Sequence, residues 1–303
     1  MRDKRFEVIG LAIKIGDRPT FWIEGAARVK RFLSEADFSG CGVLCHNTMF
    51  DGAILDWLYD VRPKVWLDTL CMARALHGVD QSVSLKNVAE RYGVGVKGTE
   101  IQNTMGKHID DFTTEELSRF AEYAINDVDL TYDIFKLMLP NFPQQELELI
   151  DLTLRMYIEP TLRLDLAGLQ EHLTETRSRK DTLLEEAGVA KEELMSNPKF
   201  AALLEGLGVT PPMKISPTTG KETFAFAKSD EGFKALAEHE NDKVQSLVAA
   251  RLGTKSTLEE TRTERFISIA KRGLLPVPVR YYAAHTGRWG GDDKINLQNL
   301  PSR

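Results

Sequence analysis

The sequence predicts an α/β domain followed by a mainly α-helical region. Apolar residues alternate between positions 6 and 24, as is typical of a β-hairpin, and a long amphipathic helix is indicated at about 114–139. After Pro140 and Pro143 the strand patterns largely disappear and long charged helices replace them. The change of pattern places a domain boundary near these two prolines.

The composition is that of a globular protein with enough apolar residues for two domains. The chain has 303 residues, and 42% of them are hydrophobic. No stretch approaches the roughly 20 apolar residues that are needed to cross a bilayer, and the first residues lead into a strand rather than a signal-peptide core. We therefore expect a cytoplasmic protein without a membrane partner.

The three cysteines do not form a disulfide framework, because their number is odd and their density is low. Cys41, Cys45, His46 and Cys71 are chemically suited to zinc. However, Cys41 and Cys45 share one face of a predicted strand, where small buried cysteines are common. We interpret the cysteines as reduced thiols.

Charge is distributed unevenly along the chain. The net charge is −6, yet 11 Lys/Arg stand against 5 Asp/Glu between Lys243 and Arg303, so this segment carries +6 and the remainder −12. A basic segment on an acidic chain is compatible with a surface that contacts phosphates, and also with an ordinary solvated face.

The first part of the chain reads as alternating strands and helices. The hairpin at 6–24 turns at 16–19, and a further strand follows near 41–46. Helices are predicted near 50–59, 69–77 and 85–92, the last of them ended by Gly93. Thr113 and Glu116 have the spacing of a capping box for the helix at 114–139, which Pro140 closes.

The second part reads as helices. The predicted ranges are 144–157, 166–187, 198–206, 231–238 and 243–272. Pro211, Pro212 and the Ser-Pro-Thr-Thr-Gly run at 216–220 predict a loop between them. The domain boundaries are placed at 1–142, 143–275 and 276–303.

Three polar residues of the first domain can share one site. Asp51 follows the strand at 41–46, at the start of a helix, where an Asp is usually only a cap. Tyr123 and Asp127 lie four residues apart in the long helix and therefore on one of its faces. Taken alone, this pair reads more readily as a tyrosine at the core margin and a surface aspartate.

Taken in order, Asn47-Thr-Met-Phe-Asp51 and Tyr123-x-x-x-Asp127 resemble the second and third motifs of DEDD-type 3′–5′ exonucleases. The resemblance implies a ribonuclease H-like fold that carries two Mg²⁺ or Mn²⁺ ions and binds a single-stranded 3′ end of DNA. It assigns metal ligation to Asp51 and Asp127, and the positioning of the attacking water to Tyr123. The Asp68-Thr-Leu run and the helix at 85–92 also stand where such domains carry them.

The family's first motif, an Asp-x-Glu on a strand, should precede the strand at 6–15, and the sequence starts at Met1 without it. By the resemblance, two of four metal carboxylates and a central strand are missing. We therefore expect an incomplete sheet and little or no exonuclease activity from this chain alone.

The most specific signal is the run from Tyr281 to Trp289, Tyr-Tyr-Ala-Ala-His-Thr-Gly-Arg-Trp, followed by Asn-Leu-Gln-Asn-Leu-Pro at 296–301. The two blocks resemble the first palm motif of family A DNA polymerases, in a form common among phage enzymes. Arginine and amide side chains suit minor-groove edges, whose acceptor pattern is nearly independent of sequence. The resemblance implies contacts with primer-template DNA from Thr286, Arg288, Asn296, Gln298 and Asn299.

Upstream, the run Arg251-Leu-Gly-Thr-Lys255-Ser256-Thr257 resembles the thumb segment that grips the DNA backbone. Basic and hydroxyl side chains are ordinary phosphate partners. Without the palm motif the same run reads as a solvated helix face. With it, Arg251, Lys255, Ser256 and Thr257 are predicted to bind DNA.

These resemblances identify an exonuclease domain at 1–142, a helical thumb at 143–275 and the start of a palm at 276–303. The chain would be part of a replicative family A polymerase, acting with complementing fragments and, if phage-encoded, in the host cytoplasm. The sequence ends at Arg303, before the palm aspartates, so polymerisation by this chain alone is not expected. One alternative is a non-catalytic module that binds DNA or a partner protein. Another is a stand-alone DEDD-type exoribonuclease, which leaves the palm motif unexplained.

Overall fold

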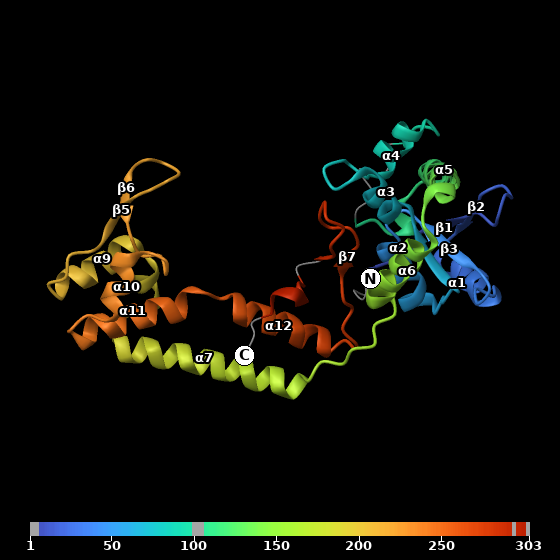
Figure 1. Ribbon diagram of the computed structural model, residues 1–303. Coiled ribbons are helices and arrows are strands. Elements are labelled where there is room, and N and C mark those ends of the chain that lie inside the picture. The colour runs from blue at the N-terminus through green and yellow to red at the C-terminus, as the bar shows by residue number, and fades with distance from the viewer. Residues whose placement is uncertain (1–5, 99–105, 293–294, 301–303) are drawn as a thin grey trace. The chain divides into compact units, whose positions relative to one another are not determined.

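The computed structural model describes residues 6–98, 106–292 and 295–300. They group into two compact units, which are described separately (Figure 1). Unit 1 contains the residues up to Leu162 together with those from Leu275 onward, and unit 2 is Arg163–Leu274. Within the described ranges, no helix combines the length and the apolar character of a membrane span.

Unit 1 begins with alternating strands and helices, and the predicted hairpin at its start is confirmed. β1 (Gly10–Ile13) pairs antiparallel with β2 (Phe21–Glu24), and β3 (Gly42–Cys45) pairs parallel with β4 (Val65–Asp68). The helices of this part are α1 (Ala26–Glu35), α2 (Thr48–Tyr59), α3 (Thr69–His77) and α4 (Leu85–Tyr92). The sequence analysis did not predict α1 or β4.

The long helix α5 (Thr114–Met138) connects the two pairs of strands, because it contacts β1, β2 and β3. The predicted capping box is present: Thr113 Oγ1 accepts from the Glu116 amide at 3.2 Å, and the Glu116 carboxylate accepts from the Thr113 amide at 2.8 Å. Short 3₁₀ turns flank the helix at η2 (Ile109–Asp111) and η3 (Leu139–Asn141).

Helix α6 (Gln144–Ile158) packs in unit 1 with β4 and α2, although it lies beyond the predicted boundary at 142/143. Its residues Ile150, Leu154 and Ile158 repeat every four positions and are at most 1% exposed. They join the core around Trp66, which is itself fully buried. The compact unit therefore needs α6, because this apolar stripe fills its core.

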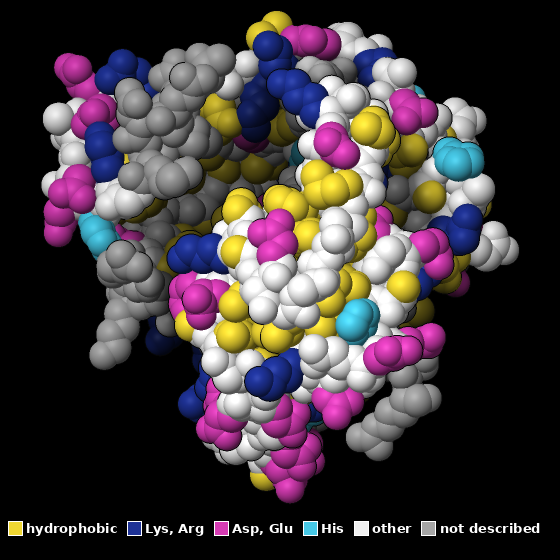
Figure 2. Space-filling model, turned by 90° about the vertical axis from the view of Figure 1, so that its left-hand side faces the viewer, with side chains coloured by type: hydrophobic (Ala, Val, Ile, Leu, Met, Phe, Trp, Pro, Cys, Tyr) yellow, Lys and Arg dark blue, Asp and Glu magenta, His cyan; other side chains and the backbone are white. Residues whose placement is uncertain are grey.

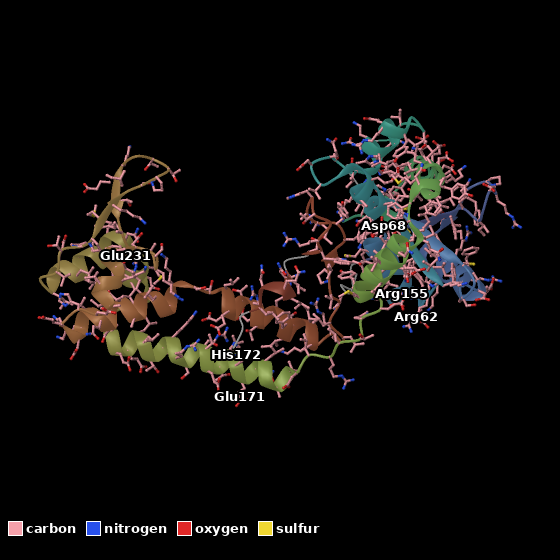
Figure 3. The ribbon with its side chains drawn as sticks, viewed as in Figure 1. Arg62, Asp68, Arg155, Glu171, His172 and Glu231 are labelled. Carbon is pink, nitrogen blue, oxygen red and sulfur yellow. The ribbon has the colours of Figure 1, made fainter. Side chains whose placement is uncertain are left out.

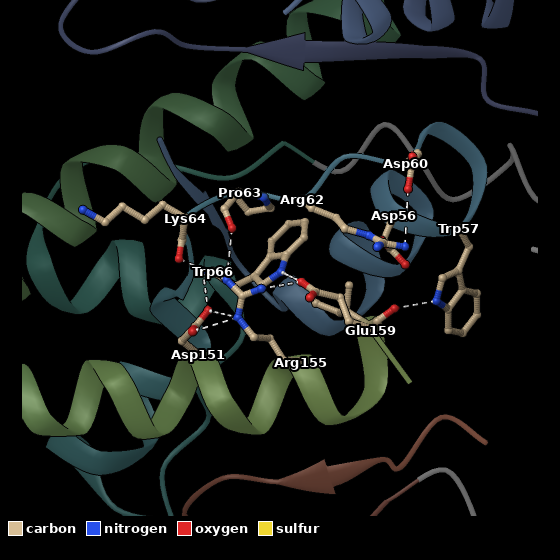
Figure 4. Close-up of polar contacts among 11 residues, drawn as sticks. Asp56, Trp57, Asp60, Arg62, Pro63, Lys64, Trp66, Asp151, Arg155 and Glu159 are labelled. Atoms are coloured by element: carbon tan, nitrogen blue, oxygen red, sulfur yellow. Dashed lines mark hydrogen bonds and ion pairs between the residues drawn. The ribbon is translucent and has the colours of Figure 1, made fainter. Parts of the chain in front are cut away.

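Arg155 on α6 fixes the helix to the edge of β4 (Figure 4). Its guanidinium binds Asp151 at 2.9 Å and Glu159 at 2.6 Å and donates to the carbonyl oxygens of Pro63 and Lys64. The same carboxylates accept from Trp66, Asp151 from the backbone amide and Glu159 from the indole. One arginine thus satisfies polar groups on both sides of the contact.

The segment after Leu275 also packs on α6. It contains β7 (Val279–Arg280), β8 (Gly290–Gly291) and η4 (Leu297–Asn299). The Tyr281 hydroxyl donates to Glu146, and the indole of Trp289 donates to Thr153 Oγ1 at 2.9 Å. The Tyr281 side chain lies in the same core as Trp66. The predicted palm segment is therefore part of unit 1.

Unit 2 is mostly helical. Its long helix α7 (Leu166–Ala187) lies beside α11 (Asp242–Lys255) and α12 (Leu258–Ala270) (Figure 1). The shorter elements are α8 (Lys191–Met195), α9 (Asn197–Gly206), β5 (Met213–Ile215), β6 (Glu222–Phe224) and α10 (Glu231–Ala237). β5 and β6 form an antiparallel hairpin around the predicted loop at 216–220.

The helix predicted at 243–272 is two helices, α11 and α12, which are separated at Ser256 and Thr257. Thr257 and Glu260 are three residues apart, which is the spacing of a capping box. Glu259 and Glu260 lie in the first turn of α12, where acidic side chains suit the positive end of the helix dipole. An ion pair of Lys180 with Glu260 at 2.6 Å holds α12 to α7. His172 of α7, labelled in Figure 3, has its Nε2 3.2 Å from the Glu259 carboxylate of α12.

Candidate active site

The tight turn between β3 and α2 places Asp51 at the start of a helix. Asn47 adopts the left-handed conformation, with φ 77° and ψ 52°, which asparagine tolerates better than most residues. Thr48 is buried and donates to the carbonyl of Leu67 at 2.6 Å. Helix α2 therefore starts directly after the strand, and Asp51 lies in its first turn.

Asp68, labelled in Figure 3, lies at the end of β4 and joins the beginnings of two helices. Its carboxylate accepts from the amides of Asn47 and Thr48 at 3.1 Å each, and from the Leu70 amide at 2.8 Å. The side chain is 1% exposed. Asp68 thus caps α3 and supports the start of α2, which fixes the backbone around Asp51.

His46 is a second anchor of this region. Its Nδ1 lies 2.8 Å from Thr69 Oγ1, and its Nε2 lies 2.9 Å from the carbonyl oxygen of Val83, which can only accept. The proton of the neutral ring is therefore on Nε2. Burial lowers the pKa of His46, and the nearby charge of Lys97 acts in the same direction.

Tyr123 and Asp127 share one face of α5, as predicted. Tyr123 is 9% exposed. The Lys97 ammonium lies 2.5 Å from Asp127 Oδ2 and 5.1 Å from the centre of the Tyr123 ring. The other carboxylate oxygen, Oδ1, is buried and has no hydrogen-bond partner among the residues that the structure describes.

The Asp51 carboxyl is buried and is affected by the charges of two other aspartates. Burial raises the pKa of Asp51 to about 6, and the charges of Asp68 and Asp127 add to this effect. Burial also opposes the charged form of Lys97, but hydrogen bonds to Asp127 and Tyr123 outweigh it and raise the pKa of Lys97. The site therefore combines carboxylates with one lysine cation.

The donor set does not fit a pair of divalent metal ions. Among the described residues, no three His, Cys, Asp or Glu side chains are arranged to hold one. Asp68 is occupied by backbone amides, and Asp127 is paired with Lys97. Each Mg²⁺ requires near-octahedral oxygen coordination, which two carboxylates supply only in small part. The zinc alternative has no such cluster either, since Cys71 contacts Asp68 and Cys41 is exposed.

This region is an α/β domain with an acidic site between a strand end and a long helix. Residues 29–142 match the family model of a 3′–5′ exonuclease domain, which covers a little over a third of the chain. No curated protein matches the chain. Asp51, Tyr123 and Asp127 all lie within the matched residues. A domain of this family indicates a nuclease function related to polymerase proofreading; such domains bind DNA and generally use divalent metal ions.

The residues predicted to contact primer-template DNA lie in the last segment of unit 1. A turn at Gly287, with φ 72°, leaves Thr286 and Arg288 exposed. Gln298 and Asn299 are exposed as well, and the Gln298 amide nitrogen lies 3.4 Å from the Trp289 carbonyl. This contact links the two sequence blocks. Within the second block, the half-buried Asn296 accepts from the Gln298 backbone amide and caps η4. Pro301, the last residue of the predicted motif, is outside the described residues.

The predicted DNA-binding run in unit 2, at 251–257, contains both exposed and buried side chains. Lys255, Ser256 and Thr257 are exposed at the junction of α11 and α12. Arg251, which the sequence predicts to contact phosphates, is instead buried, with 1% exposed. Its guanidinium donates to the Leu194 carbonyl and to Asn197.

Arg251 is enclosed by aromatic rings. The guanidinium carbon lies 4.5 Å from the centre of the Phe200 ring and 5.1 Å from that of Phe226. Spacing alone could not separate Arg251 from Lys255, because the burial of Arg251 depends on α8, α9 and Phe226, which follows β6. Figure 2 shows acidic and basic side chains interspersed on the drawn face, rather than one continuous basic surface.

The sequence analysis did not identify Lys97 or His46 as parts of the site. Lys97 follows Gly93-Val-Gly-Val, a run whose two glycines both adopt positive φ. Such a glycine-rich run indicates a close backbone approach. It does not reveal which residue of α5 the loop approaches.

Proposed function

We propose that this chain is part of a DNA-replicating family A DNA polymerase with a 3′–5′ proofreading exonuclease domain. The observation that supports the proposal is that Asp51, Tyr123 and Asp127 all lie inside the segment that matches the exonuclease family, and that the charge of Asp127 raises the pKa of both Asp51 and Tyr123. In this function Asp51 and Asp127 lie beside the 3′ end of single-stranded DNA, and Tyr123 orients the reacting water.

The palm and thumb assignments complete the proposal. The exposed Thr286, Arg288 and Gln298 are held on one short segment, which supports their contact with primer-template DNA. Lys255 and the hydroxyls of Ser256 and Thr257 are exposed and chemically suited to phosphates. The expected cytoplasmic location and a role for complementing polymerase fragments belong to the same proposal.

We further propose that the 303-residue chain by itself degrades DNA slowly. The support is the donor set, in which one of the two candidate carboxylates is paired with Lys97. The ion pair between Lys97 and Asp127 also favours a second candidate function, a non-catalytic module that binds DNA or a partner protein. Both functions include DNA binding, and they differ in catalysis.

DNA binding is tested by fluorescence anisotropy with a labelled primer-template duplex at several salt concentrations. We expect weak binding whose affinity falls with salt, because phosphate contacts release counterions. The Arg288→Ala/Gln298→Ala double variant should bind roughly tenfold more weakly, since it removes two groups suited to base edges. Lys221→Ala removes an exposed cation of the β5–β6 hairpin and is the control. Equal binding by the double variant and the wild type would contradict the palm assignment.

Catalysis is tested with 5′-labelled single-stranded DNA and Mg²⁺ or Mn²⁺. Slow 3′ shortening that disappears in Asp51→Ala/Asp127→Ala supports a weakened exonuclease. Binding without any shortening supports the non-catalytic module. Rapid degradation that needs both aspartates would contradict the proposed deficiency.

A further inference from the structure

The loop that carries Lys97 is fixed on the surface of α5. Gly95 has φ +148°, and a Cβ atom there would lie only 2.9 Å from Leu130 Cδ2, so a glycine is required at this approach. One residue further, the carbonyl of Val96 accepts from the Asn126 side-chain amide at 3.1 Å. Both contacts precede Lys97 directly and determine where its side chain starts.

The Lys97 side chain is held in the site rather than in solvent. Its exposed fraction is 26%, and that of Asp127 is 23%. The ammonium lies 2.5 Å from Asp127 Oδ2 and 5.1 Å from the centre of the Tyr123 ring, so it contacts both predicted site residues of α5. A lysine at this depth keeps its charge because a carboxylate pairs with it.

A cation at this position competes with any other cation for the same carboxylate. A divalent metal ion on Asp127 Oδ2 would lie about 2 Å from that oxygen and within a few ångströms of the ammonium. Two positive charges at such a separation repel strongly where water screens them only in part. The metal ion and the bound lysine therefore exclude each other at this oxygen.

We propose that Lys97 is the resident cation of this site: its ammonium occupies the Asp127 carboxylate and thereby weakens divalent metal binding. A metal ion binds well only when the lysine is displaced. The inference deepens the proposed function and rests on it, since the resemblance to 3′–5′ exonucleases is what assigns Asp127 as a metal ligand. The contacts of Gly95 and Asn126 with the loop stand independently of that assignment.

The test is a titration of the full 303-residue chain with Mn²⁺, in which free Mn²⁺ is measured by electron paramagnetic resonance. Lys97→Met removes the charge but keeps most of the side-chain volume, and it should bind Mn²⁺ roughly tenfold more tightly than the wild type. Lys97→Gln keeps a hydrogen-bond donor toward Asp127 and should show the same gain. Lys97→Arg keeps the charge and should resemble the wild type.

Two controls separate this effect from a general change in charge or fold. Lys86→Met removes an exposed cation from α4 and should leave Mn²⁺ affinity within about twofold of the wild type. Gly95→Ala keeps Lys97 but pushes its loop away from Leu130, so it should also increase Mn²⁺ affinity. Circular dichroism confirms that each variant is folded.

The outcomes distinguish the inference from the proposed function. If Lys97→Met and Lys97→Gln bind Mn²⁺ no more tightly than the wild type, the resident cation is refuted and the proposed nuclease site stands. If Lys97→Met gains affinity and Lys97→Met/Asp127→Asn loses it again, both are supported. A gain that persists without the Asp127 carboxylate overturns the assignment of the metal to Asp127, and with it the proposed site.

Discussion

Lys97 in unit 1 and Arg251 in unit 2 are both withdrawn from solvent, but their surroundings differ. Lys97 is paired with the Asp127 carboxylate and remains about a quarter exposed. Arg251 is 1% exposed, packs against two phenylalanine rings and donates to a carbonyl and an amide oxygen. Burial lowers the pKa of Arg251, whereas the pKa of Lys97 is raised by its partners against the effect of burial.

The comparison shows that the role of a cationic side chain depends more on the groups that surround it than on its own charge. A lysine held by one carboxylate near solvent can be exchanged for another cation, because water can enter and both groups can be rehydrated. An arginine that is closed in by aromatic rings can leave only if the surrounding core opens. Lys97 is therefore suited to control a site, and Arg251 to stabilise a fold.

The largest expected effect is the loss of Arg251. Arg251→Ala should destabilise unit 2 by about 3 kcal/mol or more, because it leaves a cavity and the buried Leu194 carbonyl without its donor. All four tryptophans, Trp22, Trp57, Trp66 and Trp289, are in unit 1. Thermal unfolding followed by far-ultraviolet circular dichroism should therefore change, while the transition followed by tryptophan fluorescence stays close to that of the wild type.

Arg251→Met sharpens this prediction by keeping most of the side-chain volume. It should cost less than Arg251→Ala, about 1–2 kcal/mol, if packing against the rings is the larger contribution. If both variants lowered the free energy of unfolding by the same amount, the stabilisation would come from the hydrogen bonds of the Arg251 guanidinium. If Arg251→Ala left the helical transition unchanged, Arg251 would have no structural role and its contrast with Lys97 would disappear.

The second effect concerns the acidic site of unit 1 and depends on pH. The folded-state pKa of Asp51 is about 6, above the ordinary 3.8, so between these values the folded state binds more protons than the unfolded state. Stability must therefore fall as pH rises from about 4 to 6, by up to ~3 kcal/mol. Asp51→Asn should lack this fall and be more stable than the wild type at pH 7.

Urea unfolding followed by tryptophan fluorescence at several pH values measures this contribution. The difference between wild type and Asp51→Asn isolates Asp51 from the other titrating groups of the site, such as His46. A difference that does not change between pH 4 and 7 would show that Asp51 is well solvated in the folded state. The acidic site would then resemble an ordinary surface.

The smallest effect on stability is expected at Lys255, the exposed counterpart of Arg251 in the same predicted DNA-binding run. Lys255→Ala should change the free energy of unfolding by less than about 0.5 kcal/mol. It should weaken primer-template binding about threefold and reduce the slope of log affinity against log salt by about one. A normal salt slope in this variant would remove Lys255 from the proposed DNA contacts.

Local patterns predicted much of unit 1 before its tertiary structure. The capping box at Thr113 and Glu116 fixed the start of α5, and four-residue spacing placed Tyr123 and Asp127 on one face. Strand β4 was missed because it has only four residues and follows Pro63 closely. Helix α6 was predicted as a helix but assigned to the second domain, since a proline boundary does not reveal which core an apolar stripe enters.

The sequence by itself determined the helices with clear caps, the β1–β2 hairpin and the residue types that resemble exonuclease and palm motifs. Only the tertiary structure decided that Arg251 is buried, that Lys97 pairs with Asp127 and that the segment after Leu275 packs on α6. The physical reason is that caps and periodicity act within a few neighbouring residues. Burial and ion pairing instead depend on side chains that are 30 to 135 positions apart, as in Lys97 with Asp127 and Tyr281 with Glu146.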